Sequence, residues 1–270
     1  MSKLLLTDLD GTLLKDNKTI SEVNRKAIDA MIEAGHYFVI CTGRPVASGR
    51  KIAEDLGLIR KGCYIICFNG GVIYDLGQDL AVQKYTLPKP VVERLFAEAA
   101  NAHVYIQTYD DSSILATEHT KELDYYRFHS NMPYRILSSI EDLAEEPAKA
   151  LLIDLDVTGS LDAFQKQNLE WTEEYTNSFF SAAEYLEYVP KGIDKGAALM
   201  RLAEYLGVSA EDTYAIGDER NDISMLLAAG TGIAMQNARD EVKAIADAIT
   251  EADNNHHGVA EAIRKFILEK

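Results

Sequence analysis

The chain has 270 residues, of which 47 % are hydrophobic, and it carries a formal net charge of −16. This length suffices for one large domain or two modest ones, and the apolar content argues against intrinsic disorder. The acidic balance disfavours nucleic acids and acidic membranes as partners, because a basic surface is what attracts both.

Targeting and redox features are sparse. No apolar run approaches the ~18 residues of a membrane span, and the first apolar run is shorter than the roughly 7–15 residues of a signal peptide. Cys41, Cys63 and Cys67 lie in apolar contexts and are predicted to be reduced and structural. These features predict a cytoplasmic protein without a membrane partner.

In the N-terminal part of the chain, buried strands alternate with amphipathic helices. Ser21 begins the first helix and Gly35 ends it. The predicted strands are 4–7, 37–41 and 64–68, and the predicted helices are 21–34 and a segment from Pro45 to about Leu56. This alternation is typical of a parallel α/β sheet.

The middle of the chain differs. Short strands are predicted at 103–109, 134–137, 149–155, 177–183 and 185–189, with a long polar helix at 158–173. The last two strands are joined by a short turn, which favours an antiparallel or mixed sheet. Most of the 14 Tyr residues and the single Trp also fall here. We therefore predict a second domain at 84–189.

The C-terminal part returns to the alternating pattern. The predicted elements are a helix at 195–206 that ends at Gly207, a strand at 213–218, a helix at 222–229, a strand at 232–235 and a last helix from about Val259. The sequence thus predicts an α/β protein with a Rossmann-like parallel-sheet core. Residues 1–83 and 190–270 form this discontinuous core, and 84–189 is an inserted α/β domain.

Two aspartates stand at the end of the first buried strand, in "LLLTDLDGTLL". Residues two apart in an extended segment point the same way, so Asp8 and Asp10 tend to share one side of the strand end. Such close carboxylates repel unless a cation neutralises them or one is protonated. A simple Asp–Gly turn is the alternative, but ligands of open α/β sheets bind at strand ends.

Three further polar clusters fall at comparable places, and their convergence favours a site. Thr42 and Gly43 follow the second strand, and Lys195 stands in the first turn of a helix, where a cation opposes the helix dipole unless an anion faces it. The third cluster, after a C-terminal strand, consists of Asp218, Asn221 and Asp222. Singly, these are an ordinary turn threonine, a solvated lysine and a polar loop.

The motifs D-x-D-G-T-L, T-G-R, K-G-x-x-K-G and G-D-x-x-N-D, in this order, resemble the haloacid dehalogenase superfamily. The insert after the third strand looks like that of the Cof-type phosphatase branch, with a large α/β (type C2) cap. The match covers both ends of the chain motif by motif, and the middle by size and element order. The resemblance implies a phosphatase that passes through an aspartyl-phosphate.

The resemblance also implies roles for the residues. Asp8 is the nucleophile, and Asp10 is the acid that protonates the leaving oxygen and then activates water. Mg²⁺ is the implied cofactor, held by Asp8, the backbone carbonyl of Asp10, and Asp218. The implied phosphate contacts are Lys195, Thr42, Asn221 and the amides of Leu9 and Gly43. Asp222 would orient Lys195 or a metal-bound water, and Glu219 would add an outer contact.

Three features stay open at this stage. Arg44 could reach substrate or close a surface ion pair. His256 and His257 look like a metal pair, but adjacent histidines before a helix more often form a polar loop, and no third ligand has suitable spacing. Asn69 and Gly70 could line the cleft, although a tight turn accounts for them as well.

The leading functional prediction is a Mg²⁺-dependent phosphatase of small phosphorylated metabolites, such as sugar phosphates or a phosphorylated cofactor, with the insert as a lid. A sugar phosphomutase of the same superfamily is the enzymatic alternative. A phosphate-sensing or partner-binding module is the non-enzymatic one, but no catalytic carboxylate or lysine is missing. The second acid at Asp10 argues against a dehalogenase.

Overall fold

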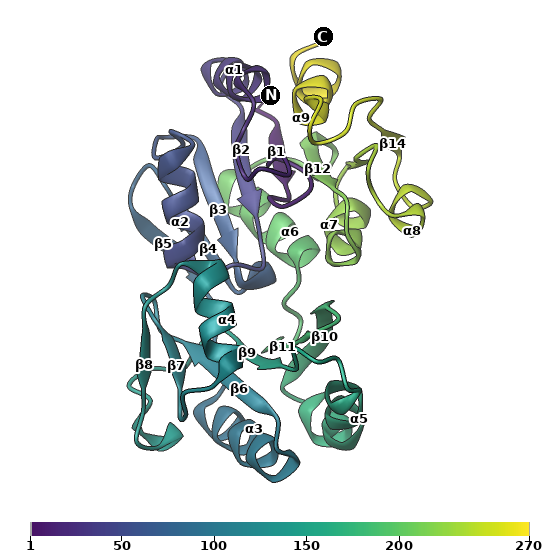
Figure 1. The fold of residues 1–270 in the computed structure, drawn as a ribbon. Helices are drawn as coiled ribbons and strands as arrows, with labels where there is room; N and C mark the ends of the chain where they lie inside the picture. Colours follow the sequence, from purple (N-terminus) through teal and green to yellow (C-terminus); the bar gives the residue numbers. More distant parts are fainter. Residues whose placement is uncertain (1, 270) are drawn as a thin grey trace. The chain divides into compact units, whose positions relative to one another are not determined.

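The computed structural model describes residues 2–269, which form two compact units. Unit 1 contains the described residues up to Thr42, the segment Arg50–Gln83 and the described residues from Asp194 onward. Unit 2 contains Gly43–Gly49 and Lys84–Ile193. Each unit is built on its own β-sheet (Figure 1). The predicted α/β class with a parallel-sheet core is confirmed.

Unit 1 carries an eight-stranded sheet in the order β14-β13-β12-β1-β2-β3-β4-β5. Its strands are β1 (Leu4–Thr7), β2 (Tyr37–Cys41), β3 (Cys63–Cys67), β4 (Val72–Asp75), β5 (Leu80–Lys84), β12 (Thr213–Gly217), β13 (Thr231–Ala234) and β14 (Ala248–Ile249). The strands from β14 to β3 pair in parallel, and β4 turns back antiparallel to β3. β1 and β3 are buried along their whole length, as expected for strands covered on both faces.

Helices pair with one another around this sheet, α1 with α9 and α6 with α7 (Figure 1). The helices wholly within unit 1 are α1 (Glu22–Glu33), α6 (Lys195–Leu206), α7 (Ile223–Ala228), α8 (Asp240–Lys243) and α9 (Gly258–Ala262), the last continuing as a π-helical segment, Ile263–Leu268. Helix α2 (Val46–Asp55) begins in the segment assigned to unit 2 and ends in unit 1. Ser21 caps α1 by accepting from the amide of Asn24, as its position predicted. The Lys3 ammonium donates to the carbonyl of Phe266 and so ties the two ends of unit 1 together.

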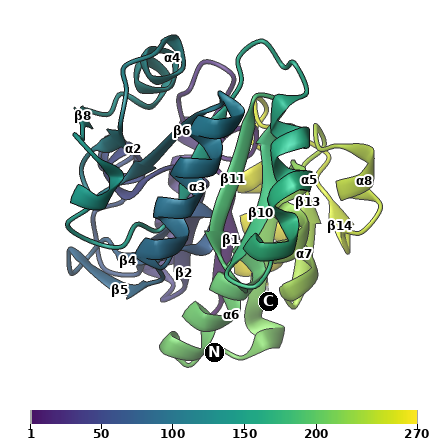
Figure 2. The same ribbon diagram turned by 90° about the horizontal axis from the view of Figure 1, so that it is seen from below.

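Unit 2 has a six-stranded mixed sheet in the order β10-β11-β9-β6-β7-β8. Its elements are α3 (Lys89–Ala102), β6 (Tyr105–Tyr109), β7 (Ile114–Ala116), α4 (Lys121–Ser130), β8 (Tyr134–Ile136), β9 (Ala150–Ile153), α5 (Ser160–Thr172), β10 (Thr176–Ala182) and β11 (Tyr185–Pro190). β10 and β11 pair antiparallel, as the short turn between them predicted. Figure 2 shows α3 and α5 side by side on one face of this sheet, where their apolar side chains form the core with Ile106, Leu152 and Tyr188.

Most predicted elements are present with small shifts at their ends. The third strand ends at Cys67 rather than Phe68, because Phe68 has a positive φ of 53° and turns the chain. The strand expected from 103 begins at Tyr105, since His103 caps α3 in the left-handed conformation. The helices at Lys89–Ala102 and Lys121–Ser130 were not predicted. No helix among residues 2–269 is long and apolar enough to span a membrane.

Candidate active site

Three parallel strands of unit 1 bring the predicted residues to one edge of the sheet. β1 lies between β12 and β2, with Thr7 opposite Ile216 on one side and Ile40 on the other. Asp8, Asp218 and Thr42 each follow directly after one of these strands. Because the carboxyl ends of parallel strands meet at the same edge, residues more than 200 positions apart become neighbours.

Lys195 lies between two carboxylates. Its Nζ donates to Asp8 Oδ1 and to Asp222 Oδ1, each over 2.6 Å, and all three side chains are buried. Lys195 is the first residue of α6, where Asp194 caps the helix by accepting from the amide of Ala197. A cation at this end of a helix is unfavourable alone, so the two carboxylates supply the anion that its position required.

Burial and charge act in opposite senses on this cluster. Burial raises the pKa of the Asp8 carboxyl well above its ordinary range, although the nearby Lys195 lowers it. Burial would lower the pKa of Lys195, but Asp222 and Asp8 outweigh this effect and raise that pKa. Lys195 therefore stays charged, but this one lysine does not offset the effect of burial on the Asp8 carboxyl.

Asp222 is fully engaged by the protein. One of its oxygens accepts from Lys195, and the other accepts from the backbone amides of Asp218 and Glu219 at 2.9 and 3.0 Å. Its side chain is completely buried. Asp222 therefore fixes both the lysine and the loop that carries Asp218.

Asp218 faces the loop after β1. Its Oδ1 accepts from the Thr12 hydroxyl at 2.5 Å, and a Cβ added to Gly11 would lie 2.4 Å from its Oδ2. Burial raises the pKa of Asp218 to about 7, although the Thr12 hydrogen bond lowers it. The sequence analysis assigned no role to Thr12. Its position in the D-x-D-G-T motif, two residues after Asp10, is the feature of the sequence that could have indicated one.

The acidic cluster fits a divalent cation. Carboxylate oxygens of Asp8, Asp218 and Asp222 all lie within 4.8 Å of one another. The raised pKa values of Asp8 and Asp218 show that a positive charge would stabilise their ionised forms. Since Asp222 already serves Lys195 and two amides, Asp8 and Asp218 are the side chains best able to hold a metal.

Asp10 lies in a different environment from Asp8. Its side chain is 37 % exposed, and its Oδ1 accepts from Lys18 Nζ at 2.7 Å. Each of the two neighbouring aspartates thus has a lysine of its own, Lys195 for Asp8 and Lys18 for Asp10. The sequence analysis missed Lys18, which is brought close by the turn that follows Leu14.

Of the remaining residues singled out in the sequence, Asn221 and Asn69 are in contact, whereas Glu219 points to the exposed side of its loop. The Asn221 amide donates to Asn69 Oδ1 at 3.4 Å, and the Asn69 backbone amide donates to the carbonyl of Thr42. Asn69 therefore both shapes the turn after β3 and reaches the polar cluster. Glu219 accepts from Arg239 at 2.6 Å on the exposed side of its loop, which sequence reasoning did not foresee.

Two residues singled out in the sequence belong to unit 2. Gly43 and Arg44 lie in its segment Gly43–Gly49, and the carbonyl of Gly43 accepts from Lys149 Nζ at 3.2 Å. Leu9, whose amide is predicted to contact phosphate, has a fully buried side chain in unit 1. The phosphate contacts of Leu9 and Gly43 and the possible substrate contact of Arg44 stay predictions.

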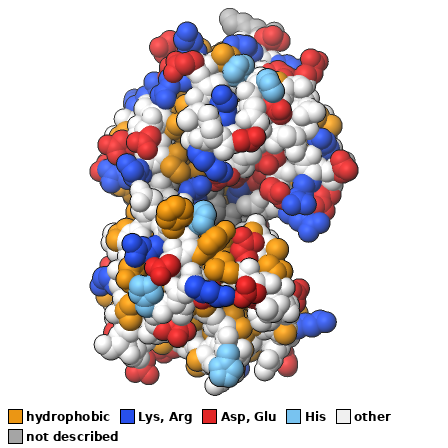
Figure 3. Space-filling model, viewed as in Figure 1, with side chains coloured by type: hydrophobic (Ala, Val, Ile, Leu, Met, Phe, Trp, Pro, Cys, Tyr) orange, Lys and Arg blue, Asp and Glu red, His pale blue; other side chains and the backbone are white. Residues whose placement is uncertain are grey.

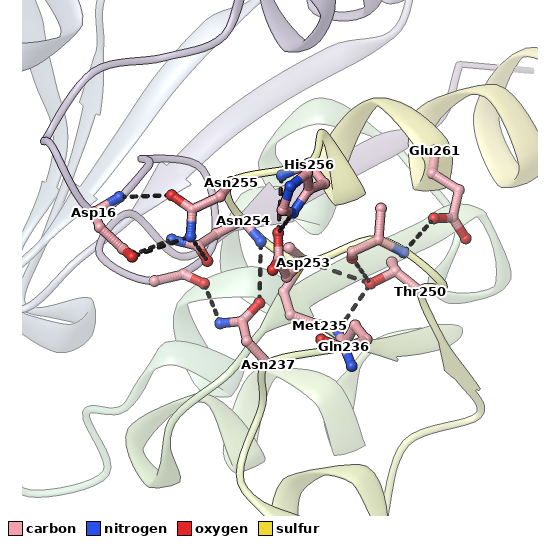
Figure 4. Close-up of polar contacts among 12 residues, drawn as sticks. Asp16, Met235, Gln236, Asn237, Thr250, Asp253, Asn254, Asn255, His256 and Glu261 are labelled. Atoms are coloured by element: carbon pink, nitrogen blue, oxygen red, sulfur yellow. Dashed lines mark hydrogen bonds and ion pairs between the residues drawn. The ribbon is translucent and has the colours of Figure 1, made fainter.

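The two adjacent histidines belong to a polar loop. His256 pairs with Asp253, Nδ1 to Oδ1 at 2.7 Å, and His257 has a positive φ of 77° just before α9. Figure 4 shows His256 beside Asp253 and next to a chain of asparagine contacts. Among the histidine, cysteine, aspartate and glutamate side chains of residues 2–269, one group lies close enough together to hold a metal, and it consists of Asp8, Asp218 and Asp222. The three cysteines are buried thiols that are not joined in a disulfide, as predicted.

Fold and site together are those of an enzyme of the phosphatase class. The sequence profile of the haloacid dehalogenase-like hydrolases matches residues 5–263, and the chain belongs to this family. It is 34 % identical to the 5-amino-6-(5-phospho-D-ribitylamino)uracil phosphatase YcsE of Bacillus subtilis, over 98 % of this chain and 96 % of that one. It is 32 % identical to the phosphatase YwpJ of the same organism, over 98 % and 100 %.

A solved structure agrees with these relatives. The crystal structure of a haloacid dehalogenase-like hydrolase from Bacteroides thetaiotaomicron superposes with a TM-score of 0.89 at 35 % identity. The match covers 98 % of this chain and 99 % of that chain. The predicted family and the predicted class of enzyme are therefore confirmed.

Proposed function

We propose that this protein is a Mg²⁺-dependent phosphatase that hydrolyses small phosphorylated metabolites through an aspartyl-phosphate on Asp8. The observation that carries the proposal is the buried Asp8–Lys195–Asp222 arrangement beside Asp218. A phosphate monoester is very slow to hydrolyse, so a site for it must neutralise phosphoryl charge and hold a nucleophile in line. A buried carboxylate next to a fixed ammonium meets both needs.

In the first step, an oxygen of Asp8 attacks phosphorus and the bond to the leaving oxygen breaks. Asp10 gives its proton to that oxygen. In the second step, Asp10 takes a proton from water, the water oxygen bonds to phosphorus, and the bond to Asp8 breaks. The exposed ion pair between Asp10 and Lys18 opposes neither step strongly, because exposed pairs contribute only ~0–1 kcal/mol.

The other residues of the site stabilise the negative charge of the transferred phosphoryl group. Lys195 and Thr42 hold phosphate oxygens, together with Asn221 and the amides of Leu9 and Gly43. Asp222 keeps Lys195 in place and Glu219 gives outer support. Arg44 either contacts substrate or closes a surface ion pair. Asp8, Asp218 and the backbone carbonyl of Asp10 would hold Mg²⁺, which when bound supplies further neutralisation of the phosphoryl group.

The substrates we propose are small phosphorylated metabolites, such as sugar phosphates or a phosphorylated cofactor. Three relatives, 29–34 % identical to this chain, are named phosphatases of 5-amino-6-(5-phospho-D-ribitylamino)uracil, which supports a small phosphorylated metabolite as substrate. We further propose residues 1–83 and 190–270 as the catalytic core and 84–189 as the cap, with hinges near 84–88 and 188–192. A sugar phosphomutase stays the alternative, and the cytoplasmic location stays a prediction from composition.

The test is hydrolysis of 4-nitrophenyl phosphate with and without Mg²⁺ by the native protein, Asp8→Asn and Asp10→Asn. Asp162→Asn, an exposed position on α5, is the matched control for the same chemical change. We expect turnover that requires Mg²⁺ and is lost in the first two variants only. Full activity in Asp8→Asn would overturn the mechanism. A panel of sugar and cofactor phosphates then identifies the substrate, and dependence on a bisphosphate activator would favour the phosphomutase.

A further inference from the structure

The loop after β14 is tied to the loop that carries Asp10. Asn254 Nδ2 donates to the carbonyl of Leu14 and to Asp16 Oδ1, each over 3.0 Å. Asn255 adds a reciprocal pair with Asp16, donating to its carboxylate at 3.0 Å and accepting from its amide at 3.2 Å. Figure 4 shows these asparagines side by side, pointing at Asp16.

Asn254 is the buried member of this group. It is only 4 % exposed, whereas Asn255 and Asp16 lie toward the surface. Hydrogen bonds from Asn254 and Asn255 lower the pKa of the Asp16 carboxyl, so Asp16 is an acceptor at neutral pH. Both protons of the buried Asn254 side-chain amide are donated in hydrogen bonds. Loss of this amide would leave the Leu14 carbonyl without its hydrogen bond, so Asn254 contributes more to the loop geometry than the more exposed Asn255–Asp16 pair does.

A third asparagine, Asn237, connects this group to the residue after Asp10. Asn237 Oδ1 accepts from the backbone amide of Asn254 at 3.1 Å, and Asn237 Nδ2 donates to the carbonyl of Gly11 at 2.8 Å. Two residues further along the chain, the Arg239 amide donates to the carbonyl of Asp218. Hydrogen bonds therefore link Asn254 to Asn237 and Asn237 to the residue after Asp10, and the same chain segment, at Arg239, contacts the loop that carries Asp218.

Asp10 directly precedes the turn that this network holds at Gly11, Leu14 and Asp16. Gly11 follows it directly, and Leu14 forms a β-bridge with it. The Leu14 amide also donates to the carbonyl of Leu9 at 2.9 Å, which closes the turn around Asp10. The Asp10 side chain itself is partly exposed, so packing alone does not fix its position. Its placement depends on the backbone on either side.

We propose that Asn254, assisted by Asn237, is a positioning residue that holds the Gly11–Asp16 turn so that Asp10 reaches the leaving oxygen of the substrate. This inference rests on the proposed function, in which Asp10 is the general acid. Neither asparagine touches Asp8 or Lys195 in the contacts described, so the network acts on the proton transfer rather than on phosphate binding. A misplacement of the acid by about 1 Å is enough to cost up to ~10²-fold in rate.

Two aryl esters separate this role from a general loss of structure. Phenol is a weaker acid than 4-nitrophenol, so phenyl phosphate needs a proton on its leaving oxygen more than 4-nitrophenyl phosphate does. For Asn254→Ala we expect kcat/KM to fall about 10- to 100-fold on phenyl phosphate and several-fold less on the nitrophenyl ester. The inhibition constant of inorganic phosphate should stay within about twofold of the native value.

The matched control is Glu261→Gln. The Glu261 carboxylate accepts from the amides of Glu251 and Ala252, so it supports the same loop without contacting the Gly11–Asp16 turn. We expect it to lower the melting temperature while leaving the ratio of the two esters unchanged. Asp16→Ala, at an exposed position, gives a variant that folds even if Asn254→Ala does not, with a smaller change of the ratio in the same direction.

The outcomes are distinguishable from failure of the proposed function. Suppose that Asp8→Asn is inactive, but that Asn254→Ala and Asp16→Ala lower kcat/KM by the same factor on both esters and only in proportion to their loss of stability, as expected for Glu261→Gln. The positioning role is then wrong, although the proposed function stands. If Asp8→Asn stays active, the mechanism fails before this question arises. Asp10→Asn is the reference, and it should show the largest difference between the two esters.

Discussion

The ammonium of Lys195 lies 2.6 Å from the carboxylate of Asp8, and both side chains are buried in unit 1. A second carboxylate, that of Asp222, lies at the same distance on the same nitrogen. The lysine is therefore the only described cation in contact with this buried group of carboxylates. Both the stability of the site and its proposed chemistry depend on it.

Replacement of Lys195 should lower both turnover and stability, whereas replacement of a surface lysine should change neither much. For Lys195→Met we expect at least ~10³-fold loss of turnover, because charge stabilisation of the transferred group is removed. Breaking a buried pair should also cost about 3–5 kcal/mol of unfolding free energy. Lys166→Met, at an exposed position on α5, should change either quantity little. Denaturant titration and steady-state kinetics measure both, and an active Lys195→Met would contradict the assignment.

Metal binding should become more stabilising as pH rises. The pKa of Asp218 is raised to about 7 in the folded protein, and that of Asp8 is also raised. In the metal-free protein, the stability linked to these carboxyls is complete below their unfolded pKa and is lost as pH rises through the folded pKa. A cation needs the ionised forms, so its binding releases protons.

We therefore expect the increase in melting temperature caused by Mg²⁺ to grow between about pH 6 and about pH 8.5. Thermal denaturation with and without the metal measures it. Asp218→Asn should remove most of the increase at every pH. An increase that shrinks with rising pH in the native protein would show that other groups bind the metal.

Gly11 and Gly35 offer a matched comparison. Their φ angles are 84° and 86°, so alanine strains the backbone equally at both. A Cβ on Gly11 would lie 2.4 Å from Asp218 Oδ2, whereas a Cβ on Gly35 meets nothing within 4 Å. Both variants should lose about 1 kcal/mol of stability from the backbone. Only Gly11→Ala should also lose Mg²⁺ affinity and turnover, and equal activities would disprove the close approach.

Two buried tyrosines of unit 2 should respond oppositely to removal of the hydroxyl. The Tyr188 hydroxyl is buried and has no hydrogen-bond partner within the described chain, whereas the Tyr109 hydroxyl accepts from Gln107 at 2.7 Å. Tyr188→Phe should therefore raise the unfolding free energy by about 1 kcal/mol. Tyr109→Phe should lower it by about 1–3 kcal/mol, since it leaves the Gln107 amide unsatisfied. Urea titration of both variants decides, and a loss in Tyr188→Phe would reveal an unseen partner.

The surface of unit 2 explains why part of its structure escaped prediction. Figure 3 shows hydrophobic side chains gathered on the visible face of this unit. Helix α4 buries only Leu123 among its ten residues and exposes Phe128 by 82 %, so it lacks the apolar stripe that marks a helix in sequence. Helix α3 has Pro90 in its first turn, where proline is tolerated although it reads as a break.

The sequence by itself determined the elements that depend on local preferences. Ser21 starts α1 and Gly207 ends α6 because capping needs only a few neighbouring residues. It also determined which chemical groups follow the strands, since Asp8, Thr42 and Asp218 are recognisable from motif spacing alone.

Only the tertiary structure decided how these groups are paired. The placement of β1 between β12 and β2 brings Thr12 to Asp218 across 206 positions. Asn254 reaches Leu14 across 240 positions for the same reason. Such contacts depend on which strands become neighbours in the sheet, and that order is set by packing of the whole unit rather than by any local run of residues.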